Sequence, residues 1–115
     1  MIDFKKICVK PSSSIKKTME IISNGSLKIA LVVDTNNCFL GTLSDGDIRR
    51  QGLLKGKSLD DSIDGIYNTN ATISDTMTTK KELFDLCIQN QISHIPIIDK
   101  NNRIIELFVL DDFFV

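Results

Sequence analysis

Hydrophobic and polar positions alternate in the same order in two stretches of the chain, KIALVVDTNNCFLGTLSDGDI (28–48) and SHIPIIDKNNRIIELFVLDDF (93–113). In each, an apolar run leads into a polar turn built on Asn-Asn, and a second apolar run follows. Asp34 and Asp99 occupy matching positions at an offset of 65 residues. This pattern predicts two β-hairpins with a longer, type-I-like turn. The strands are predicted at 30–33, 39–43, 95–98 and 104–110.

A helical spacing of apolar residues precedes each hairpin. Ile15, Met19 and Ile22 recur at helical intervals after a serine cluster suited to capping. The second helix has the same spacing, and Thr79 with Glu82 forms a capping-box pattern at its start. The other positions that recur in the second helix are Leu83, Leu86, Cys87 and Asn90. Gly25 and Asn90 occupy equivalent positions near the two helix ends, where a left-handed residue is favoured.

Each unit therefore reads strand–helix–strand–strand–helix. A short strand is predicted before each helix, at 7–10 and 71–74, and the first unit closes with a helix at 45–54 that Gly56 ends. A unit of about 50 residues hardly buries its faces alone, so two units in one domain are expected. We predict an α/β (α+β) fold in which two β-α-β-β-α repeats pack sheet against sheet with pseudo-twofold symmetry. The predicted boundaries are 1–58 and 59–115, and the second closing helix is expected to be truncated.

Composition narrows the possible functions. The 115 residues carry a net charge of −1, which lacks the basicity expected of a protein that binds nucleic acid or anionic membranes. No apolar run is long enough to span a bilayer and the amino end lacks a secretory signal, so a cytoplasmic location is expected. Cys8, Cys38 and Cys87 are scattered and His94 is the single histidine, which predicts no metal site and no catalytic grouping. The cysteines are expected to be buried, reduced thiols.

Two motifs carry a resemblance to a known family. The run GTLSDGD (41–47) resembles the Gly-x-x-Ser/Thr-x-x-Asp pattern of cystathionine-β-synthase (CBS) domains, and HIPIID (94–99) resembles the strand before their hairpin. Two copies in order resemble a tandem CBS pair, the Bateman module. The run GTLSDGDIRRQGLLKG is similar to CBS pairs fused ahead of bacterial sugar-phosphate nucleotidyltransferases of surface-polysaccharide pathways. That resemblance implies a C-terminal catalytic domain in the parent chain.

Ser44 and Asp47 are the leading candidates for ligand contacts. At the start of a helix, unpartnered amides and the helix dipole attract phosphate, a hydroxyl can donate to a ligand, and a carboxylate can accept from two ribose hydroxyls. In the family, the corresponding residues contact the ribose-phosphate of adenosine nucleotides. The competing interpretation is a capping box, in which Ser44 and Asp47 satisfy each other's backbone. A metal site at Asp45 and Asp47 is disfavoured because no further spaced oxygen ligands accompany them.

Four further residues complete the candidate set: Lys28, Arg49, His94 and Asp112. Basic residues often occupy the position of Lys28 in the family, while a solvated lysine is the structural alternative. Adjacent helical residues diverge by about 100°, so only one of Arg49 and Arg50 is expected to face a phosphate or partner chain. His94 either contacts the ligand or is hydrogen-bonded structure. Asp112 matches Asp47 in the second repeat.

The second repeat departs from the motif. Val109 stands where Ser44 would be and Glu106 where Gly41 would be, so we predict one good site, in the first repeat. Two functions then compete. The resemblance implies a sensor that binds AMP, ADP, ATP or S-adenosylmethionine and controls an attached catalytic domain. The alternative is a purely structural dimerisation module with a vestigial cleft. Apolar residues expected to be exposed on the closing helix would serve a homodimer in either case: Ile48, Leu53 and Leu54.

Overall fold

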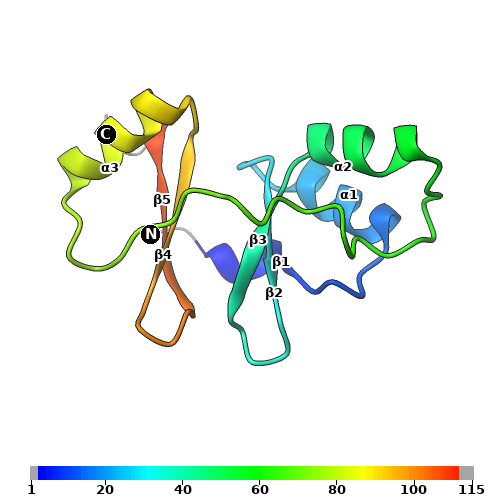
Figure 1. Cartoon of the computed structure of the whole chain (residues 1–115), viewed down its shortest axis with the longest axis horizontal. Coiled ribbons are helices and arrows are strands. Elements are labelled where there is room, and N and C mark those ends of the chain that lie inside the picture. Colours follow the sequence, from blue (N-terminus) through cyan, green and yellow to red (C-terminus); the bar gives the residue numbers. More distant parts are fainter. Residues whose placement is uncertain (1–2, 112–115) are drawn as a thin grey trace. The chain divides into compact units, whose positions relative to one another are not determined.

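The structure is a computed structural model that describes residues 3–111. These residues belong to two compact units, one comprising Asp3–Ala71 and the other beginning at Thr72. Each unit combines a small β-sheet with helices (Figure 1). The predicted mixture of α and β structure is confirmed.

The first unit is built from a small sheet, two helices and two short 3₁₀ turns. In chain order its elements are η1 (Phe4–Ile7), β1 (Cys8–Val9), α1 (Ile15–Asn24), β2 (Ala30–Val33), β3 (Phe39–Leu43), α2 (Asp45–Gln51) and η2 (Leu53–Lys55). The strands form one sheet in the order β1-β2-β3, with β1 parallel to β2 and β3 antiparallel to it. Both hairpin strands begin and end at the residues that the sequence predicts.

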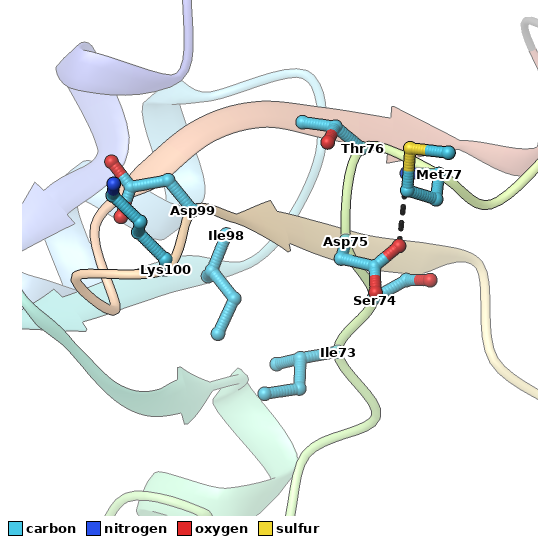
Figure 2. A pocket seen from close by; sticks show the side chains of 8 residues that line it. All are labelled: Ile73, Ser74, Asp75, Thr76, Met77, Ile98, Asp99 and Lys100. Carbon is cyan, nitrogen blue, oxygen red and sulfur yellow. Dashed lines mark hydrogen bonds between the residues drawn. The ribbon is translucent and has the colours of Figure 1, made fainter.

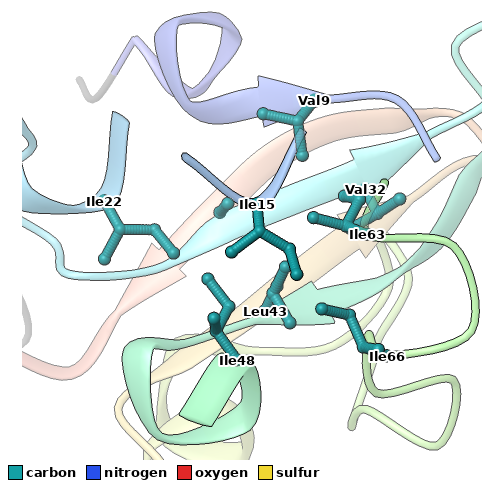
Figure 3. Packing of buried hydrophobic residues seen from close by; sticks show 9 residues of the cluster. Val9, Ile15, Ile22, Val32, Leu43, Ile48, Ile63 and Ile66 are labelled. Carbon is teal, nitrogen blue, oxygen red and sulfur yellow. The ribbon is translucent and has the colours of Figure 1, made fainter. Parts of the chain in front are cut away.

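Helix α1 begins after Ser14, whose hydroxyl oxygen accepts a hydrogen bond from the backbone N–H of Lys17 at 3.0 Å. Thr18 is fully buried, and its hydroxyl donates to the backbone oxygen of Ser14 at 2.9 Å. The inner face of the helix is otherwise apolar and packs in the core of the unit (Figure 3). Burial of each large aliphatic side chain stabilises the fold by about 1.5–3 kcal/mol. The core cluster comprises Val9, Ile15, Ile22, Ala30, Val32, Leu43, Ile48, Ile63 and Ile66.

The closing helix of the first unit is interrupted, which corrects the prediction of one helix over 45–54. Helix α2 is capped at its C-terminal end by Gly52, and the 3₁₀ turn η2 follows. A β-carbon at Gly52 would lie 2.7 Å from the backbone oxygen of Ile48, so a side chain does not fit at this junction. Gly56 ends η2 with a left-handed φ of 94°, as its predicted role requires.

The closing helix also exposes less apolar surface than expected. Ile48 is fully buried and Leu53 is half-buried, whereas 72% of Leu54 is exposed. The prediction that Ile48 is available to a partner chain is therefore wrong, because its side chain faces the core of its own unit.

The segment after the closing helix packs onto the first unit. Ile63 and Ile66 are buried in its core, and the backbones of Thr42 and Asn68 exchange two hydrogen bonds of 3.1 and 2.8 Å. The compact unit therefore extends well beyond the expected boundary at residue 58.

The second unit contains α3 (Lys80–Asn90), β4 (His94–Ile98) and β5 (Ile104–Val109). The two strands pair antiparallel, and the strand predicted at 71–74 is reduced to one parallel bridge between Ser74 and Ile97. The capping box of Thr79 and Glu82 is present, as predicted. A separate core cluster holds the unit together: Leu83, Cys87, Ile95, Ile97 and Phe108. The predicted second closing helix lies outside the described residues.

The first hairpin turn is organised by Asp34. Its Oδ1 accepts hydrogen bonds from the backbone N–H groups of Asn36 (2.8 Å) and Cys38 (2.9 Å). Asn37 takes a left-handed φ of 64°, which asparagine tolerates better than most residues.

The second hairpin turn repeats this arrangement. Asp99 Oδ1 accepts from the backbone N–H groups of Asn101 (2.8 Å) and Arg103 (3.0 Å), and Asn102 has the same φ of 64°. The predicted pairing of the two turns is therefore confirmed at the level of individual atoms.

The helix ends differ from the prediction. Gly25 has a φ of −84° and is extended, and Asn90 is still helical. The left-handed residues after the two helices are Lys28, with a φ of 61°, and Gln91, with a φ of 55°. The backbone N–H of Gly25 still donates a helical hydrogen bond to the backbone oxygen of Ile21, so the chain leaves the helix only after Gly25.

Candidate functional site at the start of α2

Strand β3 ends at Leu43 and delivers Ser44 to the N-cap of α2. The hydroxyl oxygen of Ser44 accepts from the backbone N–H of Asp47 at 3.2 Å. In return, Asp47 Oδ2 accepts from the backbone N–H and from the hydroxyl of Ser44, both at 3.0 Å. The capping box is therefore formed, and it brings the two leading candidate residues together.

The second carboxylate oxygen of Asp47 faces an arginine of its own helix. Arg50 Nη2 lies 3.3 Å from Asp47 Oδ1. A β-carbon at Gly46 would lie 2.8 Å from Arg50 Nη1, so the guanidinium group lies against the backbone of this residue. The side chain of Asp47 is 27% exposed and that of Arg50 is 55% exposed. Both carboxylate oxygens of Asp47 thus have hydrogen-bond donors within the chain. The donor to Oδ1 is Arg50, a long side chain that is largely exposed to solvent.

Asp47 also borders a hollow of about 280 Å³ between α2 and the segment that follows it. This volume lies just below the range of about 300–1,000 Å³ for small-molecule sites. Among residues 3–111, no lysine, arginine or histidine lines it. Its walls are formed by Asp47, Gln51, Gly65, Ile66, Tyr67, Asn68, Thr69 and Asn70.

The outer wall of this hollow was not predicted from the sequence. At Gly41, an added β-carbon would lie 2.3 Å from the backbone oxygen of Asn68 and 2.9 Å from Tyr67 Cδ2. Glycine is therefore required where this segment crosses β3. A glycine inside a strand is the signal that could have revealed the crossing, since it marks a close approach of another backbone. The matching position of the second unit holds an exposed Glu106.

The predicted basic residues do not gather at Asp47. Lys28 is exposed, and its Nζ donates to the backbone oxygen of Ser23 at 2.9 Å, at the end of α1. Arg49 is exposed and forms no hydrogen bond or ion pair that the structure records within residues 3–111. Of the adjacent pair of arginines, Arg50 rather than the predicted candidate Arg49 lies at Asp47.

His94 lies in the second unit, at the start of β4 and opposite Val109. It is half-buried, and this burial lowers the pKa of its imidazole, while the negative charge of Asp111 partly offsets the effect. The imidazole of His94 is therefore mostly neutral at neutral pH. Asp112 lies outside the described residues.

Among the described residues, a hollow of the second unit is lined by residues that are not in the predicted site. It measures about 860 Å³ and surrounds the turn before α3 (Figure 2). In this turn Asp75 Oδ1 accepts from the backbone N–H of Met77, whose side chain is 85% exposed. Its walls are formed by Ile73, Ser74, Asp75, Thr76, Met77, Ile98, Asp99 and Lys100.

Other chemistry is sparse in the part of the chain that the structure describes. Cys8 and Cys38 are partly buried, and Cys87 is buried. Burial raises the pKa of the Cys8 and Cys87 thiols, which keeps them protonated at neutral pH. Within residues 3–111, no three histidine, cysteine or acidic side chains are grouped as a metal would require. None of the helices described there is long and apolar enough to cross a membrane.

Comparison with protein families adds an assignment for the first unit. Residues 3–53 match the CBS domain family. An uncharacterized protein of Helicobacter pylori (strain J99 / ATCC 700824) is 44% identical over 55 residues, which make up 48% of this chain. The chain spans only 16% of the length of that relative.

Solved structures extend the similarity to more than nine-tenths of the chain. A CBS domain protein of Streptococcus pneumoniae TIGR4 has a TM-score of 0.82 at 15% identity, over 93% of this chain and 71% of that one. The chain has the CBS-domain fold. The cytosolic domain of the Mg²⁺ channel MgtE, solved in complex with ATP, has a TM-score of 0.77 at 17% identity, over 96% of this chain and 44% of that one. The predicted CBS resemblance is confirmed for the fold.

The CBS match includes Ser44, Asp47 and Arg50 but ends before the Tyr67–Asn70 wall of the hollow. The family pattern therefore indicates one side of the candidate site. The other side is supplied by the last residues of the first unit.

Proposed function

We propose that this chain is a regulatory module that binds an adenosine nucleotide through the start of α2 and thereby controls an attached domain. The observation that carries the proposal is the position of Asp47, which belongs to the CBS match and borders the hollow beside Tyr67 and Asn70. CBS domains are generally regulatory rather than catalytic. The CBS-fold relative solved with ATP supports a nucleotide as the ligand class.

The chemistry of the site suits a ribose. An ionised carboxylate accepts strong hydrogen bonds from hydroxyl groups. Asp47 can exchange its contact with Arg50 for hydrogen bonds from the hydroxyl groups of a ribose. The hydroxyl of Ser44 can rotate from Asp47 towards a ligand oxygen. AMP, ADP, ATP and S-adenosylmethionine all present this ribose. Lys28, Arg49, His94 and Asp112 are secondary candidates that rest on the CBS resemblance.

The setting of the module is also a proposal. We infer a cytoplasmic protein in which the CBS pair precedes a sugar-phosphate nucleotidyltransferase domain of sugar-nucleotide or surface-polysaccharide biosynthesis. The similarity of GTLSDGDIRRQGLLKG to such fusions supports this. A homodimer is the proposed assembly, since CBS modules often pair and the exposed Leu54 offers an apolar contact.

A second candidate function is a purely structural dimerisation module. The complete capping box favours it, because Ser44 and Asp47 already satisfy each other without any ligand. In that case their side chains serve to begin α2, and the hollow beside them has no ligand.

Thermal unfolding with added ligand separates the two candidates. A ligand at 100 times its dissociation constant stabilises the folded state by about 2.7 kcal/mol, which raises the melting temperature by several degrees. We expect such a rise with at least one of AMP, ADP, ATP and S-adenosylmethionine, and its loss in Asp47→Ala. Glu106→Ala is the matched control, because this exposed residue lies in the second unit. Absence of a shift with all four at millimolar concentration would leave only the dimerisation function.

A further inference from the structure

We propose that Arg50 is an internal competitor for the ligand, which makes the site select phosphorylated nucleosides over unphosphorylated ones. This inference rests on the proposed function and concerns the selectivity of the same site. In the ligand-free chain, the Arg50 guanidinium group occupies the carboxylate oxygen of Asp47 that Ser44 leaves unused.

The contacts distinguish Arg50 from its neighbour. Arg50 Nη2 lies 3.3 Å from Asp47 Oδ1, and the guanidinium group rests on Gly46, where a side chain would collide with it. Arg49 carries the same charge one position earlier, is exposed, and makes no recorded contact with Asp47. Arg49 is therefore a matched control for Arg50: it has the same charge on the same helical turn but does not contact Asp47.

The exposure of the pair allows exchange. Because 55% of the Arg50 side chain is exposed, its ion pair with Asp47 is weak and opens readily. A ribose hydroxyl that takes its place on Asp47 releases the guanidinium group. None of the described residues that line the hollow is basic, so the released Arg50 is the cation that a phosphate on the ligand can bind. A nucleoside without phosphate also displaces Arg50 from Asp47 but forms no contact with the released guanidinium group.

Binding of adenosine and AMP to Arg50→Gln and Arg49→Gln, measured by calorimetric titration, tests this exchange. An exposed ion pair of this kind changes an equilibrium constant up to about fivefold. We therefore expect Arg50→Gln to bind adenosine about two- to fivefold more tightly than the unmodified chain. The same variant should bind AMP about tenfold more weakly, since it loses a charged hydrogen bond. Arg49→Gln should not tighten adenosine binding.

The opposite signs of the two effects are the diagnostic result. If both variants change both affinities in the same direction and by the same factor, Arg50 acts only through net charge and the competition is refuted. If the unmodified chain binds AMP but only Arg49→Gln weakens it, Arg49 is the phosphate residue and the inference is again wrong. If neither the unmodified chain nor any variant binds either compound, both the proposed function and the competition by Arg50 are refuted. Adenosine binding that appears only in Arg50→Gln would support the competition while the unmodified chain fails as a sensor.

Discussion

The first and second units share the features that determine their fold and differ in those that would bind a ligand. Asp34 and Asp99 organise their hairpin turns through equivalent hydrogen bonds. At the end of the second hairpin strand the units diverge, because Gly41 and Ser44 are matched by Glu106 and Val109. The turn chemistry is thus repeated in both units, whereas the glycine and serine of the candidate site have no counterpart in the second.

The divergence has a structural consequence at β3. Gly41 lets the backbone of Asn68 pass within hydrogen-bonding distance of Thr42, and this crossing forms one wall of the hollow at Asp47. Glu106 carries a side chain at the equivalent position. Gly41 therefore leaves room for a crossing segment that a side chain at this position would block.

The substitution Gly41→Ala should have the largest effect on stability. The added methyl group would meet the backbone of Asn68 at 2.3 Å, so the crossing must shift and its two hydrogen bonds with Thr42 weaken. We expect a loss of about 3 kcal/mol in the free energy of unfolding, from overpacking and lost hydrogen bonds. Urea unfolding measures it. Glu106→Ala should change stability by less than about 0.5 kcal/mol, and equal losses would show that the crossing is not built as described.

The two capping boxes should be similar in stability but different in function. Ser44→Ala and Thr79→Ala each remove one N-cap acceptor, which should lower the free energy of unfolding by about 1 kcal/mol. Only Ser44→Ala should also weaken nucleotide binding, because the hydroxyl of Ser44 donates to Asp47 at the hollow, whereas Thr79 belongs to the second unit. Melting curves with and without AMP check both statements. Unchanged AMP binding in Ser44→Ala would assign Ser44 to capping alone.

A smaller effect is expected from pH. Burial lowers the pKa of His94 below 6.5, so as pH falls through 6.5 the unfolded chain takes up a proton before the folded chain does. Stability should therefore decrease until the folded pKa is reached and then level off. In His94→Ile, which copies the residue at the matching position of the first unit, this decrease should disappear. Because the chain has one histidine, its NMR titration gives the folded pKa directly. A folded-state pKa of His94 above 6.5 would contradict the expected effect of burial.

Local sequence rules predicted much of this fold. The strands at 30–33 and 39–43, the turns at Asp34 and Asp99, and the helix caps depend on residues within a few positions of each other, so their patterns are legible in the chain. The capping box at Ser44 was one of two open interpretations, and it is present.

Features that depend on distant contacts could not be predicted in this way. The interruption at Gly52 reflects close packing against Ile48 and Ile66, and the burial of Ile48 follows from the same core. The wall formed by Tyr67 and Asn68 requires knowing which segment crosses β3. The contact of Arg50 with Asp47 depends on side-chain conformation, which spacing on a helix limits but does not determine.

Titration calorimetry of AMP with Asp47→Ala and Asp112→Ala tests most directly whether one site, in the first unit, binds the ligand. Loss of the hydrogen bonds from a charged acceptor should weaken binding at least about tenfold in Asp47→Ala. Asp112→Ala, the matching change in the second repeat, should leave the affinity within about twofold of the unmodified chain. That difference is much smaller than a tenfold change, which corresponds to about 1.4 kcal/mol. Equal losses in the two variants would contradict the assignment of the site to the start of α2.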